Sequence, residues 1–337
     1  MAARIEKNFG KRSIVKSQAR RDEPLLMTFP LIFIVGPTAS GKTALALASS
    51  TRLQTEIVSM DSMQIYKSLD IGTGKPTPNE QAQVRHHLID IKNPDELYSA
   101  AQWAHDARLA IAEIRGRGKT PVVVGGTGFY ARALLQPETL ASAPPDFELR
   151  ARLQTELENF GAQSLHAHLR AVDFVAAQRL QPNDTRRVMR AIEIAQTPGA
   201  PTPGAPTPNS KFKIENFLVF GLNLPRELLY QRIEKRIEAM LQLGFMEELR
   251  RLNEMDLPPN ATAIHSLGYK QMRPVLDDAT RFDECLETWK RDTRRYAKRQ
   301  MTWFRHQLPT RWIEVDDGTD WPKIADQIAF EYSKSVV

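Results

Sequence analysis

The sequence contains a single cysteine, Cys285, among its 337 residues. One thiol cannot form an intrachain disulfide, and cysteine-based zinc sites need at least two thiols. The sequence therefore excludes a disulfide-stapled domain and a cysteine zinc site. It favours a reducing compartment, and we expect a cytoplasmic protein.

Long hydrophobic runs are also missing. No segment approaches the roughly 20 consecutive apolar residues that a membrane-spanning helix needs, so we expect no membrane partner. The first 28 residues lack the apolar stretch of a secretory signal, and they carry seven basic residues. We predict that residues 1–28 form a disordered basic arm.

Positive charge is in excess. Lysine and arginine total 46 against 40 acidic residues, which gives a net charge of +6. The excess is concentrated in the N-terminal arm and in residues 291–305. Uneven positive charge indicates a polyanionic partner, with nucleic acid as the first candidate, although a solvated basic face would give the same pattern.

Short apolar runs alternate with helical patterns along much of the chain. The runs at Leu31–Val35, Glu56–Ser59, Pro121–Val124, Phe217–Leu222 and Arg311–Val315 predict strands, and residues 42–53, 100–115 and 228–252 predict helices. Strands that alternate with helices predict an α/β fold, in which helices cover both faces of a parallel sheet.

The segment between Pro144 and Gln196 differs, because it has helical patterns and no convincing strand. We predict an all-helical insertion domain over residues 141–197. The sequence Pro-Gly-Ala-Pro-Thr then occurs twice in tandem, which predicts a linker over residues 198–211. The core domain would comprise residues 29–140 and 212–337.

A phosphate-binding motif follows the first predicted strand. It comprises Gly36, Pro37, Thr38, Ala39, Ser40, Gly41, Lys42 and Thr43, and it matches G-x-x-x-x-G-K-[ST] at every fixed position. The glycines let backbone N–H groups face an anion, Lys42 adds a positive charge, and Thr43 offers a hydroxyl to Mg²⁺. The motif predicts a P-loop NTPase-like core that binds a polyphosphate, and it leaves the identity of that polyphosphate open.

An acidic loop follows the second predicted strand and begins with Asp61, Ser62, Met63 and Gln64. In an open parallel sheet, the loop at the carboxyl end of a strand lies at the ligand crevice. Asp61 would therefore face the bound phosphates, where a carboxylate can accept a proton or hold Mg²⁺. The alternative is a structural cap.

With these two segments in order, the chain resembles the tRNA dimethylallyltransferase family, also called tRNA isopentenyltransferases. Four further stretches carry the resemblance: Gly125–Tyr130, Asn183–Glu193, Leu267–Gln271 and Ala297–Arg305. The six stretches span residues 31 to 306 in family order. The chain lacks the Cys/His zinc finger of eukaryotic cytosolic and nuclear relatives, so the resemblance favours a bacterial-type enzyme.

The resemblance implies an activity. The enzyme would transfer the dimethylallyl group from dimethylallyl diphosphate to the N6 amine of adenosine 37, in the anticodon loop of tRNAs that read codons beginning with uridine. Thr38 to Thr43 would bind the diphosphate, with Lys42 and Mg²⁺ stabilising the leaving group. Asp61 would take the amine proton, and Thr127 would donate a hydrogen bond near the bridging oxygen.

The resemblance also implies a tRNA-binding surface on a monomeric enzyme. The segments that would contact the anticodon stem-loop comprise Asp61, Ser62, Met63, Gln64, Thr127, Arg150, Arg186, Arg187, Val188, Met189, Arg190, His265, Ser266, Leu267, Gly268, Tyr269, Lys270, Lys298, Arg299, Gln300, Met301, Thr302, Trp303, Phe304 and Arg305. Many relatives carry Arg at the position of Lys270, and Arg would bind a phosphate with a fork of two donors. Arg232 and Arg236 are further candidates to clamp the diphosphate.

Three other functions remain open at this point. An adenylate isopentenyltransferase would share the fold and donor site but act on free AMP, ADP or ATP. A P-loop small-molecule kinase would use the same phosphate loop. A non-catalytic RNA-binding protein would leave the ordered positions of Lys42, Asp61 and Thr127 unexplained.

Overall fold

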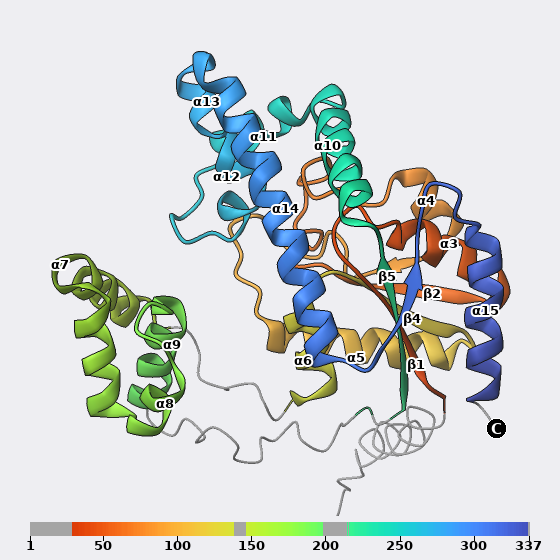
Figure 1. Cartoon of the computed structure of the whole chain (residues 1–337), viewed down its shortest axis with the longest axis horizontal. Coiled ribbons are helices and arrows are strands. Elements are labelled where there is room, and N and C mark those ends of the chain that lie inside the picture. Colours follow the sequence, from red (N-terminus) through yellow and green to blue (C-terminus); the bar gives the residue numbers. More distant parts are fainter. Residues whose placement is uncertain (1–28, 138–145, 198–213, 215, 336–337) are drawn as a thin grey trace, which may run out of the picture. The chain divides into compact units, whose positions relative to one another are not determined.

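The computed structural model describes residues 29–137, 146–197, 214 and 216–335. Backbone contacts divide the chain into two compact units (Figure 1). The larger unit extends to Leu135 and resumes at Ile214, and the smaller unit runs from Gln136 to Lys213. The predicted basic arm (residues 1–28) and linker (residues 198–211) lie outside the described residues.

The larger unit is built on a six-stranded sheet in the order β3-β2-β4-β1-β5-β6, and every neighbouring pair is parallel (Figure 1). The strands are β1 (Leu31–Val35), β2 (Thr55–Met60), β3 (His86–His87), β4 (Thr120–Gly125), β5 (Phe217–Asn223) and β6 (Thr310–Glu314). All five side chains of the central strand β1 are buried, as its unbroken apolar sequence predicts. The predicted parallel sheet is confirmed, and the two-residue strand β3 was not predicted because it is too short to show a pattern.

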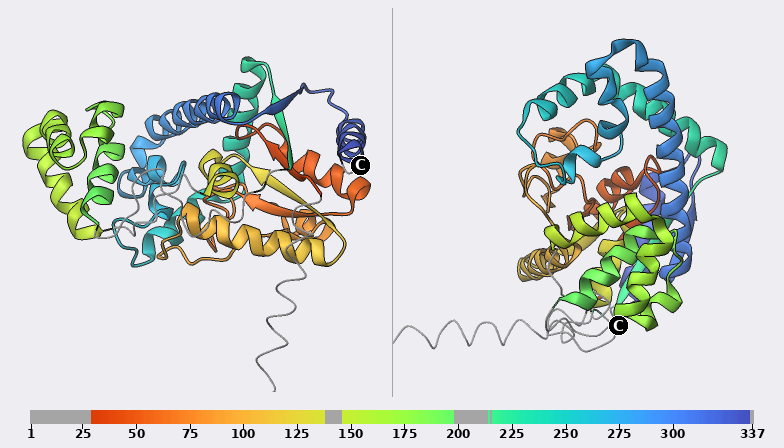
Figure 2. Two further views of the ribbon diagram at one scale, coloured as in Figure 1. Left: turned by 90° about the horizontal axis from the view of Figure 1, so that it is seen from below. Right: turned by 90° about the vertical axis from the view of Figure 1, so that its left-hand side faces the viewer.

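Helices cover both faces of this sheet. The helices are α3 (Lys42–Leu53), α4 (Pro78–Gln83), α5 (Ala100–Gly116), α6 (Gly128–Leu135), α10 (Arg226–Gln242), α11 (Phe245–Glu254), α12 (Tyr269–Met272), α13 (Pro274–Asp277), α14 (Phe282–Gln307) and α15 (Trp321–Lys334). Connections between parallel strands are right-handed, and those through α3 and α5 cross the sheet in opposite directions. Helices α3 and α5 therefore lie on opposite faces, and α15 packs against α3 (Figure 2).

The single helix predicted over residues 228–252 is in fact two helices. Helix α10 ends at Gln242 and α11 begins at Phe245. Gly244 between them has φ +98°, a left-handed conformation that a residue with a side chain rarely adopts. The break turns the chain so that Phe245 is fully buried at the start of α11.

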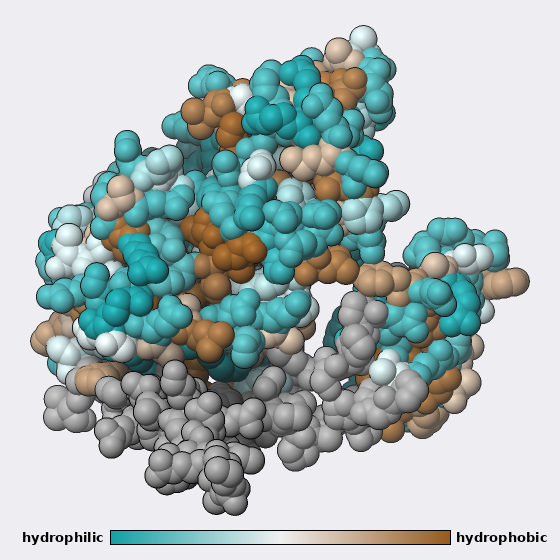
Figure 3. Space-filling view, turned by 180° about the vertical axis from the view of Figure 1, so that it is seen from behind, coloured by the Kyte–Doolittle hydropathy of each residue, from teal (hydrophilic) through white to brown (hydrophobic). Residues whose placement is uncertain are grey.

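The surface of the molecule is largely polar. In Figure 3 hydrophilic residues cover most of the visible face, and hydrophobic residues form scattered patches. Across the part of the chain that the structure describes, we find no helix whose length and apolar character would suffice to traverse a bilayer.

The described part of the smaller unit consists of helices: α7 (Phe147–Val172), α8 (Phe174–Arg179) and α9 (Thr185–Gln196). Gly161 has φ +79° and kinks α7 in its middle. The two halves of α7 pack with α8 and α9 around a small apolar core of their own that includes Leu153, Leu165, Val188 and Ile192.

A buried carboxylate stabilises this small unit. The Glu193 side chain on α9 is fully buried, and its oxygens accept hydrogen bonds from the Asp146 N–H at 2.6 Å and from Arg150 Nη2 at 3.0 Å. Arg190 forms a further ion pair with it. Burial alone raises the pKa of a carboxyl group, but the hydrogen bonds from Arg150 and Arg190 outweigh burial and lower the pKa of Glu193. Glu193 thus ties the start of α7 to α9.

We predict that Glu193→Gln lowers the free energy of unfolding of the smaller unit by about 1–3 kcal/mol, because a buried hydrogen-bonded charge is lost. Hydrogen exchange of the α7 and α9 amides measures this unit within the whole chain. The matched control is Glu158→Gln, since Glu158 is exposed on α7 and accepts a hydrogen bond from Gln154. Equal protection in the two variants would contradict the structural role of Glu193.

Candidate active site

The predicted phosphate-binding motif forms a tight loop between β1 and α3. Its backbone has positive φ at Gly36 (+152°), Ala39 (+63°) and Gly41 (+96°). A Cβ atom on Gly41 would lie 2.6 Å from the Trp321 ring of α15, so the glycine is needed for space as well as conformation. The N-terminus of α3 opens on this loop, and free N–H groups at a helix N-terminus attract anions.

Lys42 lies at the base of the loop. Its Nζ donates hydrogen bonds to the carbonyl oxygens of Gly36 at 3.1 Å and Pro37 at 2.6 Å. Its pKa is lowered to about 7, mainly by burial and also by the nearby charge of Arg236, while the charge of Asp61 partly offsets both. Two neighbouring buried cations, each with a lowered pKa, favour the binding of a polyanion.

Arg236 reaches this site from α10. Its Nη2 points at the carbonyl oxygen of Gly74, 3.4 Å away, and a Cβ atom on Gly74 would lie only 1.6 Å from that nitrogen. Burial lowers the pKa of the guanidinium, and the charge of Asp61 raises it. Arg232, the other candidate clamp, instead forms an ion pair with Asp317 at 2.8 Å. Of the two arginines, Arg236 is therefore the one whose charge acts on Lys42.

Asp61 stands directly after β2. Its Oδ1 accepts hydrogen bonds from the backbone N–H groups of Met63 at 2.8 Å and Gln64 at 3.3 Å. Its Oδ2 has no hydrogen-bond partner among the residues that the structure describes. Asp61 therefore fits both predictions made from the sequence, a structural cap and a carboxylate that faces a ligand. Its Oδ1 caps the loop, and its Oδ2 is available to a ligand.

Thr127 stands directly after Gly125 and Gly126 at the end of β4. Its Oγ1 accepts a hydrogen bond from the Ser62 N–H at 3.2 Å, and its own N–H donates to the Met60 carbonyl at 3.2 Å. Strand β4 lies between β2 and β1. The carboxyl ends of three adjacent strands therefore bring together Asp61, Thr127 and the loop of Lys42.

Helix α14 closes one side of this group of loops. The Gln300 amide accepts a hydrogen bond from the Thr38 N–H at 2.9 Å and donates one to the Gly126 carbonyl at 2.9 Å. One turn earlier, Tyr296 lies near Asp61, Thr127 and Gln300, and burial together with the Asp61 charge raises its pKa. The sequence analysis missed Tyr296, although its spacing of four residues from Gln300 places both on one face of the helix.

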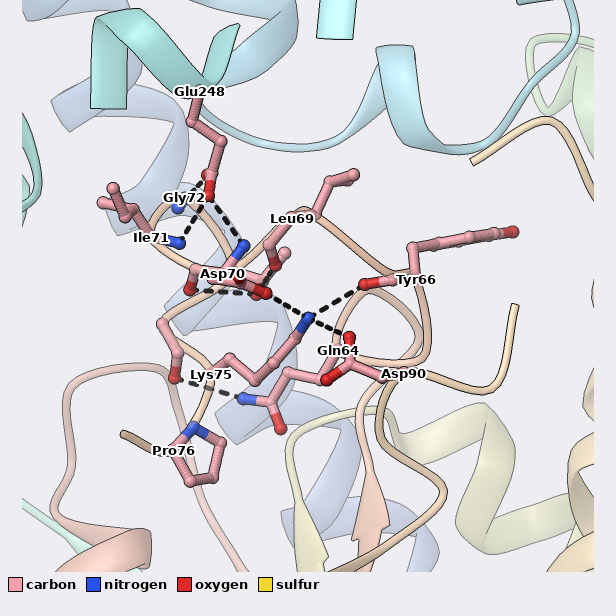
Figure 4. Close-up of polar contacts among 12 residues, drawn as sticks. Gln64, Tyr66, Leu69, Asp70, Ile71, Gly72, Lys75, Pro76, Asp90 and Glu248 are labelled. Carbon is pink, nitrogen blue, oxygen red and sulfur yellow. Dashed lines mark hydrogen bonds and ion pairs between the residues drawn. The ribbon is translucent and has the colours of Figure 1, made fainter. Parts of the chain in front are cut away.

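The rest of the acidic loop is held by a buried lysine (Figure 4). The Lys75 side chain is 3% exposed, and its Nζ bonds to the Tyr66 carbonyl at 2.9 Å and to Asp70 and Asp90 at 2.5 Å each. A charged lysine is rarely this buried unless its charge is paired. Lys75 therefore joins three turns of the segment that carries Asp61.

A buried carboxylate attaches the same loop to α11 (Figure 4). Glu248 accepts hydrogen bonds from the N–H groups of Asp70, Ile71 and Gly72 at 2.8–2.9 Å, and from the Tyr269 hydroxyl at 2.5 Å. Burial, followed by the charge of Glu248, raises the pKa of Tyr269, which keeps the hydroxyl protonated as a donor. Neither residue was recognised from the sequence as a support for the acidic loop.

The predicted tRNA-binding residues differ in exposure. Those exposed are His265, Lys270, Lys298, Arg299, Thr302 and Arg305 in the larger unit, and Arg186 and Arg187 in the smaller one. Those partly exposed are Asp61, Ser62, Met63, Gln64, Thr127, Leu267, Met301 and Trp303 in the larger unit, and Arg150, Met189 and Arg190 in the smaller one. The exposed set retains six arginine and lysine side chains from these segments besides His265.

The structure corrects the prediction for the remaining side chains. Val188, Ser266, Tyr269, Gln300 and Phe304 are at most 7% exposed, so they have too little surface to contact RNA. Gly268 is buried as well, with φ +89° and no room for a Cβ beside Trp289. These residues lie in the same stretches as the exposed ones but pack inside the protein.

The described side chains at this site offer few ligands for a magnesium ion. Among the described residues, no group of three or more His, Cys, Asp or Glu side chains is arranged to hold a metal. Mg²⁺ usually retains several waters and binds through one or two carboxylates together with substrate phosphates. Asp61 and the Thr43 hydroxyl provide oxygens at this edge, so the residues fit an ion that is held mainly by a diphosphate.

The comparisons with known proteins identify the family of this chain. The model of the IPP transferase family matches residues 64–307. The chain is 40% identical over 296 residues to the tRNA dimethylallyltransferase of Geobacillus kaustophilus (88% of this chain, 94% of that protein) and 43% identical over 289 residues to that of Symbiobacterium thermophilum (86% and 90%).

Solved structures show the same relationship. The crystal structure of the tRNA isopentenylpyrophosphate transferase from Bacillus halodurans is similar with a TM-score of 0.66 and 37% identity, covering 91% of this chain and 97% of that one. A eukaryotic dimethylallyltransferase acting on tRNA is similar with a TM-score of 0.71 and 27% identity, covering 91% and 79%. The chain therefore belongs to the IPP transferase family.

Proposed function

We propose that this protein transfers the dimethylallyl group of dimethylallyl diphosphate to the N6 amine of adenosine 37 in tRNAs that read codons beginning with uridine. The observation that carries the proposal is the meeting of Lys42, Asp61 and Thr127 at the ends of three adjacent strands. Its bacterial relatives are named tRNA dimethylallyltransferases, which favours tRNA over free adenine nucleotides as the acceptor.

On the donor side, the phosphate loop would bind the diphosphate through the N–H groups at the start of α3. Lys42 and Arg236 would neutralise the charge that grows on the diphosphate as the allylic C–O bond breaks. Binding an anion here raises the pKa of Lys42 again, because a neighbouring negative charge favours the protonated lysine. Magnesium, held by the diphosphate with Thr43, would supply further neutralising charge.

On the acceptor side, Asp61 would act as the base. The adenine N6 amine is a poor nucleophile, so removing its proton as nitrogen attacks the allylic carbon helps the reaction. The hydrogen bonds to Oδ1 fix the carboxylate and leave Oδ2 to receive that proton. The Thr127 hydroxyl accepts the Ser62 N–H, so its own hydrogen is available to a diphosphate oxygen.

Recognition of the RNA would fall to the exposed cations. Lys298 and Arg299 on α14 would contact phosphates, and the partly exposed Trp303 offers a face on which an unpaired base can stack. Adenosine 37 must leave its stack to be attacked, and a loop base does so at low cost. We expect the helical unit to grip the anticodon stem and the enzyme to act as a cytoplasmic monomer.

A prenylation assay tests the proposal. Labelled dimethylallyl diphosphate is offered with unmodified tRNA carrying adenosine 37, with AMP, or with no acceptor. We expect label to enter the tRNA alone. Label in AMP but not in tRNA would indicate an adenylate isopentenyltransferase, and ATP consumption without a prenyl product would indicate a kinase.

We predict that Asp61→Asn slows single-turnover transfer by about 10²–10⁴-fold, because the amide keeps the Oδ1 acceptor but cannot take a proton. The affinity for tRNA should stay within about threefold, since the loop retains its cap. Asp95→Asn, an exposed carboxylate in the same segment, is the matched control. A variant at Asp61 that reacts at the control's rate would rule out this base.

We also predict that Lys298→Gln weakens tRNA binding and makes the plot of log affinity against log salt concentration less steep by about one unit, as expected for one lost phosphate contact. Lys323→Gln on α15, likewise exposed, is the control and should leave the slope unchanged. An unaltered slope for Lys298→Gln would remove this residue from the interface.

A further inference from the structure

Gln300 has an amide that is occupied on both sides. The side chain is 7% exposed on α14, its Oε1 accepts the Thr38 N–H at 2.9 Å, and its Nε2 donates to the Gly126 carbonyl at 2.9 Å. Because the side chain is buried and both ends of its amide are paired within the protein, Gln300 faces the core rather than RNA. Its two partners belong to the phosphate loop and to the loop after β4.

The bridge continues to the proposed base. Gly126 precedes Thr127, whose Oγ1 accepts the Ser62 N–H at 3.2 Å, and Ser62 follows Asp61. A path of hydrogen bonds and single peptide units thus runs from the phosphate loop through Gln300 to Asp61. The group that binds the donor and the group that activates the acceptor are connected through one side chain.

The packing around the bridge leaves little freedom. A Cβ atom on Gly126 would lie 2.1 Å from Gln300 Nε2, and one on Gly128 would lie 2.3 Å from the Trp303 ring. Both loop glycines are therefore pressed against α14. This helix therefore contacts both the phosphate loop and the loop of Thr127.

We propose that Gln300 is a positioning residue that holds the phosphate loop and the Asp61–Thr127 pair at the spacing needed for transfer. The proposal rests on the proposed function, and it adds a link to RNA binding. Lys298 and Arg299, the exposed cations next to Gln300, lie on the same continuous helix. RNA that binds Lys298 and Arg299 contacts the helix that carries Gln300. Binding of the donor and binding of RNA are therefore coupled, and each changes the affinity for the other by the same factor.

Gln300→Met tests this, because methionine has a similar length but neither hydrogen bond. Binding of dimethylallyl diphosphate is measured with and without an anticodon stem-loop that carries purine riboside at position 37, which lacks the N6 amine and so prevents turnover. In the wild type we expect the RNA to tighten donor binding by about fivefold or more. In Gln300→Met we expect each ligand alone to bind within about threefold of its wild-type affinity. The factor by which RNA tightens donor binding should fall to about one. Single-turnover transfer should slow by about tenfold or more.

Gln307→Met on the same helix is the control, because Gln307 is exposed and only accepts a hydrogen bond from Arg132. Gly126→Ala breaks the same bridge from the other side. If the bridge is the cause, the double variant of Gly126 and Gln300 loses no more coupling than either single variant, whereas additive losses would contradict the proposal.

The outcomes separate the two proposals. Absence of any prenyl transfer by the wild type would reject the proposed function. Transfer by the wild type together with no coupling, or with coupling that Gln300→Met leaves intact, would reject the positioning role of Gln300 alone.

Discussion

The parallel arrangement of β2, β4 and β1 is the constraint on which the rest of this structure depends. Because these strands are neighbours that run in one direction, their carboxyl ends bring three loops to one edge of the sheet. Each loop supplies one chemical element: an anion cradle with Lys42, a carboxylate at Asp61 and a hydroxyl at Thr127. No single loop could hold both a leaving diphosphate and an incoming amine.

The electrostatics of this edge follow from burial. Burial and the charge of Arg236 lower the pKa of Lys42, burial lowers the pKa of Arg236, and the charge of Asp61 partly offsets both shifts. The site is therefore pre-organised for a ligand that carries more negative charge than Asp61 provides, which a diphosphate does. The supports of the loops are also polar: Glu248, Lys75 and Gln300 are buried with their hydrogen bonds filled. Paired buried groups of this kind fix one geometry, because any displacement leaves an unsatisfied partner.

Much of the fold and part of the site could be predicted from the sequence. The apolar run before Gly36 and the fixed spacing of the phosphate motif are local signals, so the central strand, its loop and the following helix could be found without a structure. The break at Gly244 and the strand at His86–His87 could not, because one glycine or two residues give no periodic pattern. Gln300 and Tyr269 were placed on the RNA surface because they lie within stretches that resemble the family's tRNA-contacting segments, whereas their side chains are buried. Only the tertiary partners, Thr38 and Gly126 for one and Glu248 for the other, reveal their roles.

The most direct test of the central claim is a crystal structure of the protein with dimethylallyl diphosphate and an anticodon stem-loop that carries purine riboside at position 37. The account predicts that the diphosphate lies on the N–H groups of the phosphate loop beside Lys42 and Arg236. It also predicts that the purine of position 37 is flipped toward Asp61, with its C6 facing the allylic carbon. A structure in which the diphosphate and the purine occupy separate surfaces of the protein would contradict it.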